Sequence, residues 1–119
     1  MSYDEVEARG FASSLGMVIY HIYFFKKGPA WSAEETPELE ALQAQHLANL
    51  RRLGEMGRLV LNGPLLDSFA TSGEIRGIGV LKTDSMKEAC ELLDTDPMVK
   101  VGRLVYEVHV WMVGRDILP

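Results

Sequence analysis

The chain has 119 residues, with 12 Lys and Arg against 17 Asp and Glu, a net charge of −5 at neutral pH. This length fits one domain with a hydrophobic core. The acidic balance repels phosphate backbones and anionic lipid, which excludes nucleic acid and membranes as expected partners. Cys90 is the one cysteine, so no internal disulfide or multi-cysteine metal site is expected, and a reducing cytoplasm is the expected location.

Residues 1–16 are acidic before any apolar stretch, the opposite of a secretory signal peptide. We interpret them as an N-terminal extension, or as an added helix that covers part of the domain, and we place the domain at residues 17–119. No apolar run approaches the roughly 18 residues that cross a bilayer.

The domain is predicted to start with a strand and a helix. Residues 17–25 are β-branched or aromatic on both alternating faces, as in a strand that is buried on both sides. Thr36 and Pro37 form a typical helix start, with a hydroxyl cap and a proline in the first turn. Gly57 marks the end of that helix.

The remaining residues predict three strands and one helix. Residues 58–62 form a short strand closed by Gly63 and Pro64, and a loop at 67–74 leads to a strand at 75–82.

A capping box at Ser85 begins a helix that ends near Asp94, and residues 103–113 form the last strand. The order βαββαβ predicts an α+β ferredoxin-like fold, with a four-stranded antiparallel sheet and both helices on one face.

The first and last strands also predict a homodimer. Both are apolar on their two faces, whereas the helices cover only one face of the sheet. We therefore expect two sheets to pack through their helix-free faces. His21 and His109 are interpreted as polar groups of this interface, placed to face each other across neighbouring strands beside Glu107.

His46 interrupts the apolar stripe of the helix after the first strand. It lies between Leu42 and Leu50 on the same helical face, so its imidazole points toward the core. Burying this ring costs on the order of a few kcal/mol unless both nitrogens find partners. Asp96 is the best candidate partner, because the topology places the two residues at one end of the domain.

The end of the second strand reaches the same place. His46 lies about 16 Å before the helix end at ~1.5 Å per residue, and Gly63 lies a similar distance up the following strand at ~3.3 Å per residue. His46, the Gly63–Pro64 strand end and the turn at Asp96 thus converge on one edge of the helix–sheet interface.

These residues carry a resemblance to a known family. The order and spacing of His46-Leu47, Leu50, Leu53, Gly57-Arg58-Leu59, Gly63-Pro64, Asp96-Pro97 and Gly102 resemble the YCII-related proteins. The resemblance implies a ferredoxin-like fold that dimerises as an α/β barrel, with a His-Asp active site at His46 and Asp96. A dehydrochlorinase of a chlorinated hydroxyquinol is similar to this family, and muconolactone isomerases share the barrel. Met98 departs from the family, in which an aromatic residue is common there.

Three further residues are expected to contact a small-molecule substrate. Gly63 and Pro64 border the predicted site, and Arg103, at the start of the last strand, can hold a carboxylate or phenolate through two hydrogen bonds. A solvated surface arginine is the alternative. Gly77 and Gly79 lie on one face of their strand and leave room for a ligand or, as we favour, for close packing of a helix.

Two functions fit these expectations. One is an enzyme for cofactor-independent proton transfer on a small cyclic substrate, by elimination, isomerisation or dehydrohalogenation. His46 is then the base and Asp96 its orienting partner, with no cofactor and no metal. The other is a non-catalytic small-ligand-binding or accessory dimeric protein, in which the two residues form a structural pair.

Overall fold

The computed structural model describes residues 4–67 and 74–118. Most of the predicted loop at 67–74 lies outside the described residues. The described helices and strands are α1 (Glu5–Ser14), β1 (Met17–Lys27), α2 (Pro37–Glu55), β2 (Leu59–Pro64), β3 (Ile75–Leu81), α4 (Met86–Leu93), α5 (Pro97–Lys100) and β4 (Leu104–Gly114).

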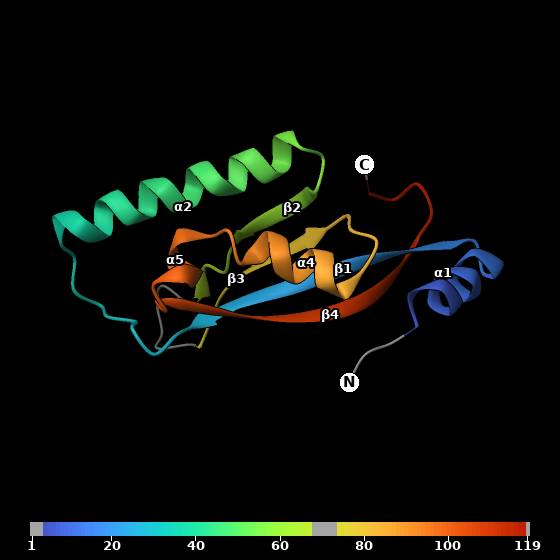
Figure 1. Ribbon diagram of the computed structural model, residues 1–119, viewed down its shortest axis with the longest axis horizontal. Helices are drawn as coiled ribbons and strands as arrows, with labels where there is room; N and C mark the ends of the chain where they lie inside the picture. The colour runs from blue at the N-terminus through green and yellow to red at the C-terminus, as the bar shows by residue number, and fades with distance from the viewer. Residues whose placement is uncertain (1–3, 68–73, 119) are drawn as a thin grey trace.

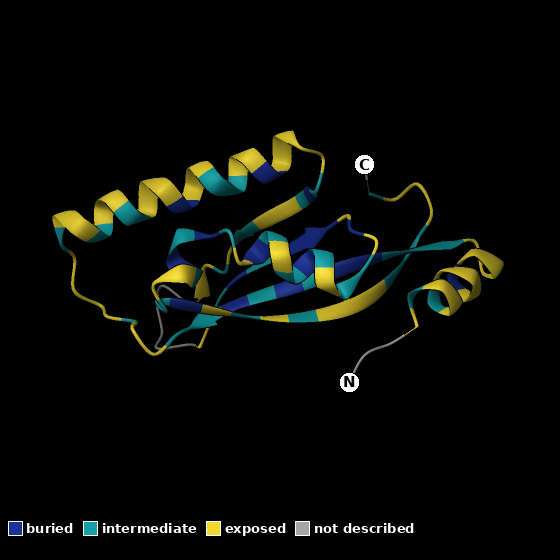
Figure 2. Cartoon of the chain, viewed as in Figure 1, coloured by how far each residue is buried: buried dark blue, intermediate teal, exposed yellow. Residues whose placement is uncertain are grey.

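The four strands form one antiparallel sheet in the order β2-β3-β1-β4. The long strands β1 and β4 pair along their whole length, and α2, α4 and α5 lie over one face of the sheet (Figure 1). Buried residues gather between these helices and the strands (Figure 2). The α+β ferredoxin-like fold is therefore confirmed.

The predicted helix caps are present. The Thr36 hydroxyl accepts a hydrogen bond from the Leu39 amide at 3.1 Å, and the Ser85 hydroxyl accepts one from the Glu88 amide at 3.0 Å. These bonds satisfy amides that have no partner within their helix. Pro64 is the last residue of β2, where an edge strand tolerates a missing N–H.

The core lies between β1 and the helices. Tyr23 and Phe25 of β1 pack with Leu81 of β3, Leu53 of α2 and Leu93 of α4, all of which are buried. These contacts fix α2 against the sheet, and with it the depth at which His46 enters the interface.

His21 and His109 do not face each other, so that prediction is wrong. His21 pairs with Val110 in the sheet, whereas His109 pairs with Ile22, and a shift of one residue puts the two rings on opposite faces. His21 is fully buried and its Nδ1 hydrogen-bonds the Thr83 hydroxyl at 2.8 Å. This burial lowers the pKa of His21.

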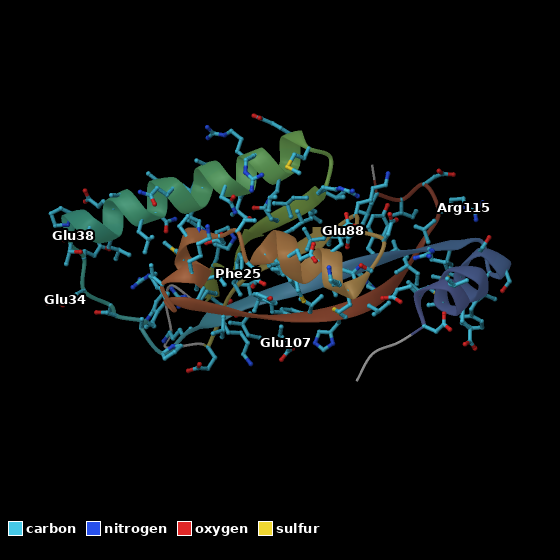
Figure 3. All side chains as sticks on the ribbon, viewed as in Figure 1. Phe25, Glu34, Glu38, Glu88, Glu107 and Arg115 are labelled. Atoms are coloured by element: carbon cyan, nitrogen blue, oxygen red, sulfur yellow. The ribbon has the colours of Figure 1, made fainter. Side chains whose placement is uncertain are left out.

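His109 lies on the exposed side of β4. Its Nε2 hydrogen-bonds Glu107 at 2.8 Å, and its ring meets Phe24 edge-on, with 6.1 Å between the centroids. The ammonium group of Lys26 lies 3.7 Å from Glu107, whose side chain is on the side of β4 away from the helices (Figure 3). A small polar cluster therefore lies among the apolar side chains of the helix-free face.

The N-terminal residues form helix α1, capped by the Asp4 side chain. The helix lies at the far end of the long β1–β4 ribbon (Figure 1) and is mostly exposed, although Ala12 is buried. Of the two interpretations of this segment, the added helix agrees with the structure. The domain boundary at residue 17 stays a prediction.

Gly79 accommodates the ring of Tyr23, which lies directly opposite on β1. A Cβ atom at residue 79 would lie 2.2 Å from the ring of Tyr23. Close packing therefore explains this glycine, although the partner is a tyrosine of the neighbouring strand.

Replacing Gly79 by Ala is expected to destabilise the protein by about 1–3 kcal/mol, because the new methyl group overpacks the core against Tyr23. Gly10→Ala is the matched control, since a Cβ atom there meets nothing within 4 Å and alanine favours helix. Urea unfolding of both variants measures the difference. Equal stabilities of the two variants would contradict this packing.

Candidate functional site

His46 of α2 and Asp96 of the turn before α5 are in direct contact. The Nδ1 atom of His46 lies 2.6 Å from Oδ2 of Asp96. His46 is 9% exposed and Asp96 is 1% exposed. Fifty positions apart in the sequence, the two residues form a short hydrogen bond that is almost entirely shielded from water.

The backbone holds the Asp96 carboxylate in place. Asp96 is the N-cap of α5, and its Oδ1 atom accepts a hydrogen bond from the Met98 amide at 2.8 Å. An ionised carboxylate only accepts hydrogen bonds, so Nδ1 of His46 is the donor in the contact. When the ring is neutral, its Nε2 atom therefore keeps its lone pair.

The His46 ring borders a cavity of about 620 Å³ and a smaller recess of about 160 Å³. Within residues 4–67 and 74–118, no hydrogen bond to Nε2 is seen. The walls of the cavity include Trp31, Gln43, Pro64, Arg76, Met98 and Arg103. A basic nitrogen on a buried ring therefore meets a space that can hold a small molecule.

The other predicted site residues lie around the same space. Pro64 borders both the cavity and the recess, Gly63 borders the recess, and Arg103 borders the cavity. Phe25 packs beside the His46 ring, with 5.8 Å between the centroids.

Tyr23 also borders the recess, and the sequence patterns did not single it out. Burial raises the pKa of Tyr23, and the negative charge of Asp96 raises it further. The hydroxyl therefore stays protonated, as a hydrogen-bond donor on the wall that His46 shares. The one signal in the sequence was Gly79, whose missing side chain makes room for this ring.

Side chains brace the His46 helix against the turn that carries Asp96. Asn49 donates a hydrogen bond to the Thr95 hydroxyl at 3.1 Å, and Arg52 donates one to Asn49 at 2.9 Å. Thr95 in turn donates to the Leu92 carbonyl at 2.6 Å. These bonds lie about one helical turn beyond His46, and they hold α2 in place against the turn that carries Asp96.

Trp31 and Arg76 are two further residues that the sequence patterns missed. The guanidinium carbon of Arg103 lies 4.1 Å from the Trp31 ring centroid, and that of Arg76 lies 4.6 Å from it. Three distant segments thus meet on one indole ring at the cavity wall. Sequence periodicity does not predict contacts of this kind between distant segments.

Across the described ranges, no group of three or more His, Cys, Asp or Glu side chains is placed to bind a metal ion. None of the described helices has the length and apolarity needed to cross a bilayer.

The YCII-related domain family matches residues 20–112, and the chain belongs to this family. The resemblance carried by the His46 and Asp96 motifs is therefore confirmed. No curated protein sequence matches the chain.

Among solved structures, the chain is similar to 5-chloro-2-hydroxyhydroquinone dehydrochlorinase from Burkholderia phenoliruptrix AC1100, in complex with 2,5-dihydroxybenzoquinone. The two share 19% identity with a TM-score of 0.48, and the match covers 77% of this chain and 90% of that one.

Replacing Asp96 by Ala is expected to cost about 1–3 kcal/mol of stability, because it removes the cap of α5 and leaves a buried His46 N–H without an acceptor. Asp96→Asn keeps a capping oxygen and is expected to lose less. Asp84→Ala is the matched control, an exposed aspartate with the same change of charge. Urea unfolding compares the three, and an Asp96→Ala loss no larger than the control's contradicts the buried bond.

Proposed function

We propose that this protein is a small-molecule enzyme that transfers a proton without a cofactor, by elimination, isomerisation or dehydrohalogenation of a small cyclic substrate. The observation that carries the proposal is the buried His46–Asp96 hydrogen bond at the edge of a cavity. Membership of the YCII-related family agrees with it.

The site assigns a role to each residue. His46 Nε2 takes a proton from a carbon of the substrate, while Asp96 orients the ring and stabilises its positive charge. In an elimination, the electron pair of the broken C–H bond forms a double bond as the leaving group departs with its own pair. In an isomerisation, His46 returns the proton to another carbon. The substrate is bordered by Gly63, Pro64 and Arg103.

The proposal includes a homodimer. Phe24, Ile22 and Trp111 lie on the sheet face opposite the helices, and none of the three is buried. A contiguous apolar face of this kind is typical of an interface. We place the dimer in the cytoplasm, because a single cysteine suits a reducing compartment.

The second candidate is a non-catalytic small-ligand-binding or accessory dimer. Asp96 favours it in one respect, because its carboxylate also caps α5, a structural task. In that case the His46–Asp96 pair serves stability alone.

The enzyme hypothesis predicts that His46→Asn reduces turnover by about 10²–10⁴-fold, the usual contribution of a general base, with little change in melting temperature. Proton transfer is followed by NMR as deuterium uptake at carbon from D₂O, over a panel of small cyclic ketones, lactones and hydroquinones. Gln45→Asn, at an exposed residue of the same helix outside the cavity lining, is the matched control. Deuterium uptake that is unchanged in His46→Asn contradicts the enzyme hypothesis. The accessory protein is favoured if His46→Asn is strongly destabilised and the wild type shows no deuterium uptake.

The dimer prediction is tested by light scattering at micromolar concentration, where a mass of twice 13.3 kDa is expected. Trp111→Glu should shift the mass toward the monomer, because it places a charge on the apolar face. Glu91→Gln, at an exposed residue of α4 on the helix side, should leave the mass unchanged. A monomeric wild type would contradict the prediction.

A further inference from the structure

Positive charge is concentrated at one wall of the cavity in a chain whose net charge is −5. Arg76 and Arg103 both stack on the ring of Trp31, and the ammonium group of Lys27 lies 5.6 Å from the same ring centroid. We call Trp31, Arg76 and Arg103 the Trp31 cluster. All three line the cavity that His46 borders.

The backbone fixes this cluster before any ligand arrives. The Gly28 amide donates to the Arg103 carbonyl at 2.8 Å, and the Ala30 amide donates to the Gly102 carbonyl at 2.9 Å. A Cβ atom on residue 28 would lie 2.2 Å from the Gly102 oxygen, so the close approach requires glycine. The loop that carries Trp31 is thereby tied to the start of β4, which carries Arg103.

Arg103 retains capacity to bind a ligand. Its Nη1 atom donates to the Ser32 carbonyl at 2.9 Å, which uses one of five N–H groups. In the part of the chain that the structure describes, Arg103 forms no ion pair with an acidic side chain. Partial burial and the nearby charge of Arg76 lower the pKa of Arg103.

Two acidic residues also line the cavity, but they come from a different part of the fold. Glu35 precedes α2 and Glu40 lies in its first turn, whereas Arg76 comes from β3 and Arg103 from the residue before β4. An anionic group is therefore favoured beside Arg76 and Arg103.

We propose that the Trp31 cluster binds the carboxylate of the substrate, so that the substrates are small carboxylic acids. The guanidinium of Arg103 matches the two oxygens of a carboxylate, and Arg76 adds a second positive charge. The apolar side chains of Leu39, Met98 and Leu104 line the same cavity and can contact the body of the acid. Its opposite end reaches His46, and this assignment of the substrate class rests on the proton-transfer function above.

Benzoate is the probe for this inference, and benzyl alcohol is its neutral counterpart. In a Trp111→Phe background, Trp31 is the remaining one of two tryptophans, so its fluorescence reports binding at the cluster. Benzoate should change this fluorescence saturably, and benzyl alcohol should bind at least about tenfold more weakly.

Variants of Arg103 test whether benzoate binding needs the guanidinium group or only a positive charge. Arg103→Gln should weaken benzoate binding by about tenfold or more, and Arg103→Lys should also weaken it, because an ammonium cannot pair with both carboxylate oxygens. Arg51→Gln is the matched control, an exposed arginine of α2 outside the cavity lining, and should stay within about twofold of the parent.

The outcomes distinguish this inference from the proposed function. Deuterium uptake should depend on His46, whereas benzoate binding should depend on Arg103. Benzoate binding that depends on Arg103, in a protein without any proton transfer, would refute the enzyme and leave the carboxylate site standing. Equal binding of benzyl alcohol and benzoate, no binding of benzoate, or an Arg103→Gln variant that binds benzoate normally, would overturn the carboxylate site.

Discussion

The hydrogen bond between His46 and Asp96 is the constraint on which the site depends. Both side chains are buried, and an unpaired polar group at such a depth costs about 1–3 kcal/mol. The bond therefore stabilises the fold and at the same time sets the orientation of the ring. Because Asp96 also accepts the Met98 amide, the carboxylate has little freedom to turn away. Because this carboxylate holds Nδ1 of His46, the other ring nitrogen, Nε2, is left to the cavity.

Much of this arrangement follows from patterns along the chain. Helical spacing alone turns His46 toward the core, and the βαββαβ order alone brings the turn at Asp96 to the same end. Side chains with a fixed period and a strong preference for burial make such predictions possible. The lengths of one helix and one strand predict that Gly63 and Pro64 lie near His46, and both border the recess beside its ring.

Other features required the three-dimensional structure. The Trp31 cluster joins a loop, β3 and the residue before β4. The register shift between Phe25 and Lys26 sets how β3 meets the end of β1. No local pattern encodes that shift. The prediction for His21 and His109 was wrong for a similar reason, because one residue of register decides the face of a side chain in a sheet. The extent of the site is therefore less predictable than its buried centre.

The tautomer of His46 tests the central claim most directly, through ¹⁵N NMR of the histidine rings near neutral pH, with His46→Asn used to assign the signal. We predict that Nδ1 carries the proton and Nε2 is bare in the wild type, and that Asp96→Asn abolishes this preference. A wild-type ring with its proton on Nε2, or a preference that survives in Asp96→Asn, would contradict the account.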